Sequence, residues 1–149
     1  QHAFSPQGPL LGVALEGRDV LMEERGVPWP PMMLVTCACT NCQKQSGAAA
    51  SVVGVAPRDG VTITGELKTY EDRAASGNAV YRQFCPECGS PILTDTLAAQ
   101  EGNLIFYKAG TLDVTADLVP TTHCWTSSGQ KWVQYPSGDT VMVRQEGLG

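Results

Sequence analysis

Two short clusters of cysteines carry the chemistry that this sequence suggests. The first contains Cys37, Cys39 and Cys42, the second contains Cys85 and Cys88, and the sixth cysteine, Cys124, stands alone. Cys-x-Cys and Cys-x-x-Cys spacings present several sulfurs to one point, as a tetrahedral zinc ion requires. Disulfides are less favoured, because close neighbours are awkward to bridge and small closed loops add little stability. We therefore expect the clustered cysteines to bind zinc.

The first cluster predicts a metal site with an open position. Cys37 and Cys39 follow an expected strand over Met32–Thr36, and Cys42 falls in the first turn of a short helix that ends at Gly47. The N-terminus of a helix stabilises a thiolate. Three protein thiolates leave the fourth zinc position free for another ligand, which is the arrangement of a catalytic metal site.

Short strands separated by turns must position these cysteines. Sixteen glycines and ten prolines suit many turns better than a helical bundle. We predict a mainly β, single-domain protein of short antiparallel strands with one or two short helical turns. A helical turn is expected at Asp19–Arg25, and Thr40 or Asn41 is expected to cap the helix at the first cluster. The other expected strands are Leu10–Glu16, Ala49–Val55, Val61–Thr64, Lys68–Glu71, Ala79–Phe84, Ile92–Thr94, Asn103–Ala109, Thr121–Thr126 and Thr140–Arg144.

Composition narrows the possible functions. The chain has 149 residues, 42% of them hydrophobic, which fits one domain of ordinary size. A net charge of −5 without a run of Lys or Arg disfavours nucleic acid as a partner. The best apolar stretch, Ala48–Ala56, is too short to cross a membrane. Gln1–Gly12 has neither the basic start nor the apolar segment of a signal peptide, so we expect a cytoplasmic protein without a membrane partner.

Several motifs occur in an order that resembles one family. Cys-x-Cys-x-x-Cys is followed by Lys44-Gln45-Ser46-Gly47, by Phe84-Cys-Pro-x-Cys-Gly, by Gly110-Thr111-Leu112-Asp113 and by His123-x-Trp125-Thr126-Ser127-Ser128. This order, from about Gly8 to Val133, resembles the glutathione-dependent formaldehyde-activating enzymes, or centromere-protein-V-like domains. The resemblance implies a zinc-containing β-tent fold. We expect an N-terminal extension over 1–7, the zinc β domain over 8–135, and a C-terminal strand and tail over 136–149.

The resemblance also implies roles for the cysteines. Cys37, Cys39 and Cys42 match the catalytic-type zinc triad of the family, whose open position receives the sulfur of glutathione. The implied reaction joins glutathione and formaldehyde into S-hydroxymethylglutathione, as a carbon–sulfur lyase-type enzyme would. Cys85 and Cys88 match half of a structural zinc site, whose other half is a Cys-x-Cys-Gly near the N-terminus. Here Pro9 and Leu11 replace those cysteines.

Three outcomes stay open for the second site. Cys85 and Cys88 can remain metal-free beside a core that contains Leu10 and Leu11. They can instead join Cys37 and Cys39 in one closed site, which would leave Cys42 free. An unusual ligand such as His2 can also complete the site. We expect at most one zinc ion per chain, at the triad of Cys37, Cys39 and Cys42.

Four further residues are candidates for substrate binding. Lys44 and Ser46 can contact a glutathione carboxylate, or be a solvated helix residue and part of a helix-end turn. His123 and Trp125 are expected on one face of a strand, where they can line the pocket with His123 as a proton shuttle, or pack in the core. Cys124 is expected on the opposite face as a small buried residue.

Charged residues and the overall function each have a second interpretation. Arg58, Arg82 and Lys108 can pair with ligand carboxylates, but we expect them to be surface charges. The alternative function is a non-catalytic, zinc-stabilised β module that binds a thiol or a protein partner, because fold does not determine function.

Overall fold

The structure, a computed structural model, describes residues 12–15, 33–112 and 115–145. Short strands make up most of it, and they are joined by tight turns and brief helices. The strands are β1 (Gly12–Leu15), β2 (Met33–Cys37), β3 (Ser51–Pro57), β4 (Val61–Thr64), β5 (Lys68–Arg73), β6 (Ala79–Phe84), β7 (Pro91–Asp95), β8 (Leu104–Lys108), β9 (Thr122–Cys124) and β10 (Thr140–Val141). The helices are α2 (Thr40–Ser46) and α3 (Leu97–Glu101), with single 3-10 turns η1 (Arg58–Gly60), η2 (Ala109–Thr111) and η3 (Thr126–Ser128).

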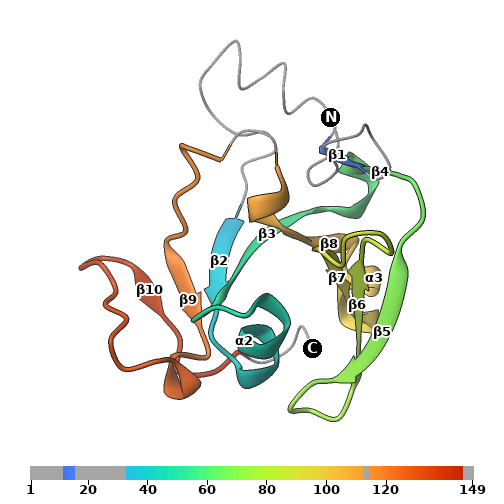
Figure 1. Ribbon diagram of the computed structural model, residues 1–149. Coiled ribbons are helices and arrows are strands. Elements are labelled where there is room, and N and C mark those ends of the chain that lie inside the picture. Colours follow the sequence, from blue (N-terminus) through green and yellow to red (C-terminus); the bar gives the residue numbers. More distant parts are fainter. Residues whose placement is uncertain (1–11, 16–32, 113–114, 146–149) are drawn as a thin grey trace.

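Eight of the strands form one sheet in the order β10-β9-β2-β3-β8-β7-β6-β5, and β1 pairs with β4 in a separate ribbon (Figure 1). Within the segment β2-β3-β8-β7-β6-β5 of this order, every neighbouring pair of strands is antiparallel. In contrast, β9 pairs in parallel with both β2 and β10. The predicted mainly β class is confirmed. The parallel pairs at the β10 edge depart from the expectation of antiparallel strands alone.

One face of the sheet carries a closely packed apolar core. Its buried members include Leu34, Ile92, Leu93, Ile105 and Tyr107. Tyr107 lies opposite Gly54 across β3 and β8. A Cβ at Gly54 would come within 2.0 Å of the Tyr107 ring, so only glycine leaves room for the tyrosine.

The other face of the sheet carries a second apolar group and holds the cysteine helix. Val35, Val53, Ala99, Phe106 and Cys124 form the buried part of this group. Figure 1 shows α2 between β2 on one side and the β5–β6 hairpin on the other. Hydrogen bonds from α2 to Asp72 and from Arg82 to α2 join the helix to that hairpin.

Several predicted elements differ from the structure at their ends. The strands Val61–Thr64 and Ala79–Phe84 are confirmed with their predicted bounds, while β9 ends at Cys124 rather than Thr126. The helix α3 was not predicted; the Thr96 hydroxyl caps it by accepting a hydrogen bond from the Ala99 N–H at 3.0 Å.

Some expectations fall on residues that the structure does not describe. These are the helical turn at Asp19–Arg25 and the roles of His2, Pro9, Leu10 and Leu11. Within the described ranges, neither α-helix is long and apolar enough to cross a bilayer.

Candidate metal centre

The three cysteines of the first cluster converge at the junction of β2 and α2. Cys37 ends β2, Cys39 is the N-cap of α2, and Cys42 lies in the first turn of that helix. The Cys39 sulfur accepts a hydrogen bond from the Cys42 N–H at 3.3 Å, so Cys39 caps the helix in place of the expected Thr40 or Asn41. The three sulfurs all lie within 4.8 Å of one another.

Hydrogen bonds from neighbouring segments hold the loop that carries these cysteines. The Ala38 carbonyl accepts hydrogen bonds from Gln43 Nε2 at 2.8 Å and from the Ser128 hydroxyl at 3.0 Å. The Ala38 N–H donates to the Cys124 carbonyl at 3.0 Å. The direction in which the cysteine side chains project is therefore set by three separate parts of the chain.

A cavity of about 930 Å³ opens beside the three sulfurs. Its size is in the range of sites for small molecules. Cys37, Cys39 and Cys42 line it, together with apolar residues of the sheet such as Val35, Val53 and Phe106. A small molecule in this cavity can therefore reach the cysteines.

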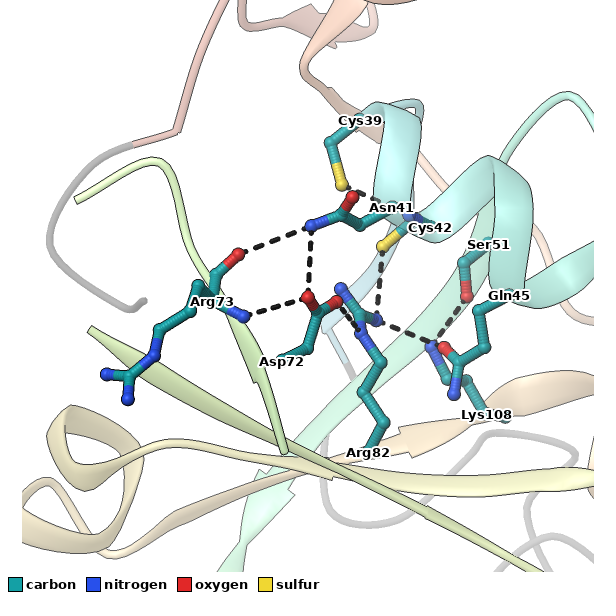
Figure 2. Close-up of polar contacts among 9 residues, drawn as sticks. All are labelled: Cys39, Asn41, Cys42, Gln45, Ser51, Asp72, Arg73, Arg82 and Lys108. Carbon is teal, nitrogen blue, oxygen red and sulfur yellow. Dashed lines mark hydrogen bonds and ion pairs between the residues drawn. The ribbon is translucent and has the colours of Figure 1, made fainter. Parts of the chain in front are cut away.

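Arg82 of β6 lies against Cys42 although only 7% of its surface is exposed. Its Nη1 group donates to the Cys42 sulfur at 3.8 Å and to Gln45 Oε1 at 3.1 Å, and its Nε donates to Asp72 at 2.7 Å (Figure 2). Burial disfavours the charged guanidinium, but the hydrogen bond to Asp72 and the nearby Cys42 outweigh it and raise the pKa of Arg82. A cation is therefore held in contact with the cluster.

Lys108 of β8 is a second buried cation at the same end of the cavity, with 8% of its surface exposed. Its Nζ donates to the Ser51 hydroxyl at 2.9 Å (Figure 2), and Ser51 is the register partner of Cys37. Burial lowers the pKa of Lys108, and negative charge at Cys42 opposes that shift.

The thiols differ in acidity because they share hydrogen bonds and face these cations. Hydrogen bonds with Cys39 and Cys42 raise the pKa of Cys37, which acts as a donor. Hydrogen bonds from Cys37 and Cys39 lower the pKa of Cys42, and Lys108 and Arg82 lower it further. Negative charge is therefore most stable at Cys42, which receives two hydrogen bonds and faces both cations.

The donor set of the triad fits a zinc ion. Zinc–sulfur bonds near 2.3 Å separate thiolates by about 3.8 Å around a tetrahedral ion. Sulfurs that already lie within 4.8 Å of one another need only small side-chain rotations to reach that separation. Cys37, Cys39 and Cys42 would hold the ion, and a fourth ligand would have to come from elsewhere.

The second cysteine cluster has different surroundings. Cys85 is 1% exposed and belongs to the apolar core, whereas Cys88 is exposed and lies 3.3 Å from the Ser90 hydroxyl. Among the described residues, the group of side chains close enough together to hold a metal ion contains only Cys37, Cys39 and Cys42. A closed site that joins both clusters is therefore absent from this part of the chain, and a metal at Cys85 and Cys88 stays a prediction.

Three of the other predicted substrate residues lie in different surroundings. Trp125 lines the cavity, with the Arg144 guanidinium 5.3 Å from its ring centroid. Lys44 is exposed and lines a separate cavity of about 550 Å³. The Ser46 hydroxyl donates to the Cys42 carbonyl at 2.7 Å, within α2. The binding roles of these residues remain predictions.

His123 and Trp125 do not share a face, contrary to expectation. Trp125 has a left-handed backbone, with φ of 57°, so the alternation of the strand stops at Cys124. Trp125 therefore packs against the second apolar group of the sheet, the group to which Cys124 belongs. Cys124 is buried, as predicted. The His123 ring instead lies between Thr36 and Asp139. Its Nδ1 atom is 2.7 Å from the Thr36 hydroxyl, and its Nε2 atom is 2.7 Å from an Asp139 carboxylate oxygen.

The expectation that Arg82 and Lys108 are surface charges is wrong. Both are buried and line the cavity beside the triad, because β6 and β8 carry these side chains on the face of the sheet that borders the cavity. The sequence contains a signal for the burial of Arg82, because Arg82 shares one face of β6 with the apolar residues Val80 and Phe84. Arg58, which is partly exposed, pairs with Asp95.

A family profile matches this chain over the region that contains the site, and individual proteins match a part of the chain. The sequence profile of the family described as "Glutathione-dependent formaldehyde-activating enzyme" matches residues 19–128. Fungal proteins named "Putative glutathione-dependent formaldehyde-activating enzyme" are similar over a shorter stretch. The protein from Aspergillus flavus is 39% identical over 56 residues, which is 36% of this chain and 28% of that protein. The protein from Podospora anserina is 39% identical over 56 residues, 36% of this chain and 25% of that protein.

The family profile and the individual relatives cover different shares of the proteins compared. This chain spans less than a third of the length of the curated relatives that it matches. The family profile, in contrast, covers more than half of the chain and includes both cysteine clusters. The chain therefore belongs to the glutathione-dependent formaldehyde-activating enzyme family.

Proposed function

We propose that this chain binds glutathione through its thiol and promotes its addition to formaldehyde, which would form S-hydroxymethylglutathione. The observation that carries the proposal is the opening of three clustered sulfurs onto a cavity of about 930 Å³. Family membership and the names of the relatives support the choice of thiol and aldehyde. The triad requires reduced cysteines, so the proposal includes a reducing compartment such as the cytoplasm.

Cys37, Cys39 and Cys42 would hold one zinc ion in this proposal. When bound, zinc lowers the pKa of a coordinated thiol, so that the thiolate is available at neutral pH. Arg82 and Lys108 stabilise the negative charge that gathers at the sulfurs.

Residues at the mouth of the cavity would orient glutathione. Arg73 and Arg144 are exposed and line the cavity, so each can pair with one of the two carboxylates of the tripeptide. Trp125 provides an apolar wall of the cavity beside Arg144. Lys44, Ser46 and His123 stay in the proposal as predicted contacts, although Lys44 would need to act from the neighbouring cavity.

The proposed reaction is an addition with no change of oxidation state. The glutathione thiol first releases its proton to water. The thiolate sulfur then forms a bond to the carbonyl carbon, the π electron pair moves to the oxygen, and that oxygen takes a proton back from water, so that no net proton is gained or lost. The new group is a hemithioacetal. This reaction class corresponds to a carbon–sulfur lyase acting in the direction of synthesis.

Adduct formation compared with the uncatalysed reaction tests this proposal. We expect the wild-type protein to accelerate the loss of free thiol in mixtures of glutathione and formaldehyde, and Cys42→Ala to abolish the acceleration. Cys88→Ala is the matched control and should retain it. Equal rates for wild type and Cys42→Ala at equal zinc loading would refute the proposal.

The alternative is a non-catalytic module that binds a thiol or a protein partner. The addition of thiols to formaldehyde proceeds without an enzyme, so a thiol-binding site does not by itself require catalysis. Glutathione binding to the wild type, without any rate above the uncatalysed reaction, would favour this alternative.

A further inference from the structure

Two buried cations beside one thiol cluster need an explanation. Lysine and arginine are rarely buried unless they are paired. Arg82 has Asp72 as a carboxylate partner at 2.7 Å. Lys108 donates to the neutral Ser51 hydroxyl, and none of the ion pairs among the described residues joins it to a carboxylate. Within the part of the chain that the structure describes, the groups whose negative charge favours the charged form of Lys108 are the sulfurs of the triad.

The charge of the site depends on what fills the fourth position. A divalent ion with three thiolates sums to −1, and a fourth thiolate takes the sum to −2. A neutral fourth ligand, such as water or imidazole, leaves it at −1. An additional buried negative charge is unfavourable unless a cation lies near it. Lys108 and Arg82 are two cations at this point of the cavity, and because Asp72 pairs with Arg82, the charge of Lys108 is the one left to offset an incoming anion.

We propose that Lys108, together with Arg82, makes the triad selective for an anionic thiolate over a neutral fourth ligand. This inference rests on the metal-holding triad of the proposed function and assigns a cause of its ligand preference. Both side chains reach the cavity from strands that are separate from the cysteine helix, Arg82 from β6 and Lys108 from β8. They act through the charge of the site and are specificity-determining residues rather than metal ligands.

The packing of Lys108 keeps its charge at the triad. Lys108 pairs in register with Val53, two residues from Ser51, so its side chain extends along the sheet toward the Cys37 row. The Ser51 hydroxyl holds the ammonium group there, and Ser51 is itself only 4% exposed. A cation fixed in a buried place attracts an incoming anion more strongly than a solvated one does.

Cobalt-loaded protein and two small ligands test the preference. The ligands are 2-mercaptoethanol, which has no carboxylate and binds as a thiolate, and imidazole, which binds as a neutral molecule. Cobalt absorption reports the binding of each at one fixed pH. We expect Lys108→Met to weaken 2-mercaptoethanol by about tenfold or more and imidazole by less than about twofold. Lys68→Met removes the same charge from an exposed position and should alter neither affinity.

Two further variants keep the test decisive if Lys108→Met fails to fold. Arg82→Gln removes the charge but keeps an amide that can contact Asp72, and it should also weaken the thiolate selectively. Lys108→Arg retains the charge and should keep the wild-type preference. An equal loss for both ligands in the charge-removing variants, or no loss for either, would overturn the proposal. Failure of formaldehyde addition alone would not, because this assay contains neither glutathione nor formaldehyde.

Discussion

The two cysteine clusters have similar spacings but very different surroundings. In the first, three sulfurs lie within 4.8 Å of one another, next to two buried cations and a cavity. In the second, Cys85 is 1% exposed within the apolar core, while Cys88 lies on the surface. Short cysteine spacing therefore identifies sulfurs that can meet, but the neighbouring strands decide what those sulfurs can do.

The local backbone explains part of this difference. In the first cluster, a strand end is followed by the first turn of a helix, and this change of direction turns three side chains toward one point. In the second, the chain makes a tight turn in which the Gly89 N–H donates to the Cys85 carbonyl at 2.8 Å and Gly89 has φ of 76°. That turn leaves one sulfur in the core and the other in solvent.

The largest expected effect is on metal content. Cys42→Ser removes one of the three ligands, and we expect metal affinity to fall by more than about 100-fold, because loss of a supporting contact alone reduces it by about 10–100-fold. Cys88→Ser makes the same chemical change in the second cluster and should leave the metal in place. Zinc per chain after dialysis against a chelator measures both. Loss of zinc from Cys88→Ser would show that the second cluster also holds metal.

A smaller effect is expected from the carboxylate that holds Arg82. Asp72→Asn leaves the guanidinium of Arg82, a side chain that is 8% exposed, without its negative partner, and it should lower the free energy of unfolding by about 1–3 kcal/mol. The neighbouring Glu71 pairs with Arg73 at 3.6 Å on the surface, so Glu71→Gln should change that free energy by less than about 0.5 kcal/mol. Urea denaturation of the two variants provides the comparison. Equal stabilities would mean that Asp72 does little to hold Arg82.

Much of the fold can be predicted from the sequence, because alternating strands leave a clear pattern. Ala79–Phe84 alternates and forms β6 with the predicted bounds. The five-residue helix α3 was missed, since its signal is little more than the capping Thr96. The end of β9 could not be predicted, because a left-handed tryptophan is rare and Trp125 has no local feature that requires it.

The cysteines of the candidate site are also evident from the sequence, but its cations are not. The triad lies within six consecutive residues, so spacing alone groups it. Arg82 is 40 residues away from Cys42 and reaches it only because the tertiary fold brings α2 against the β5–β6 hairpin. A charged residue on the apolar face of a strand is a hint of such a site, whereas its partner depends on the tertiary fold.

The third prediction concerns stability within the second cluster. Cys85 behaves as a small apolar residue in the core, so Cys85→Ser buries a hydroxyl there and should lower the free energy of unfolding by about 1–2 kcal/mol. Cys88→Ser, on the surface, should change it by less than about 0.5 kcal/mol. Thermal or urea unfolding of both variants tests this. Similar losses at both positions would indicate that the pair acts as one unit, as two ligands of a single metal would.

The smallest expected effect is on the acidity of Cys88. The Ser90 hydroxyl lies 3.3 Å from its sulfur and, by donating to the thiolate, lowers the pKa of Cys88 below that of an ordinary cysteine. Ser90→Ala removes the donor, so the pKa should rise and the pH profile of Cys88 alkylation should move to higher pH. Mass spectrometry of the iodoacetamide-treated protein gives that profile, and Ser76→Ala, in the distant β5–β6 turn, should not shift it. A Cys88 that resists alkylation across the whole pH range would contradict its assignment as a free surface thiol, because a metal-bound sulfur is shielded from the reagent.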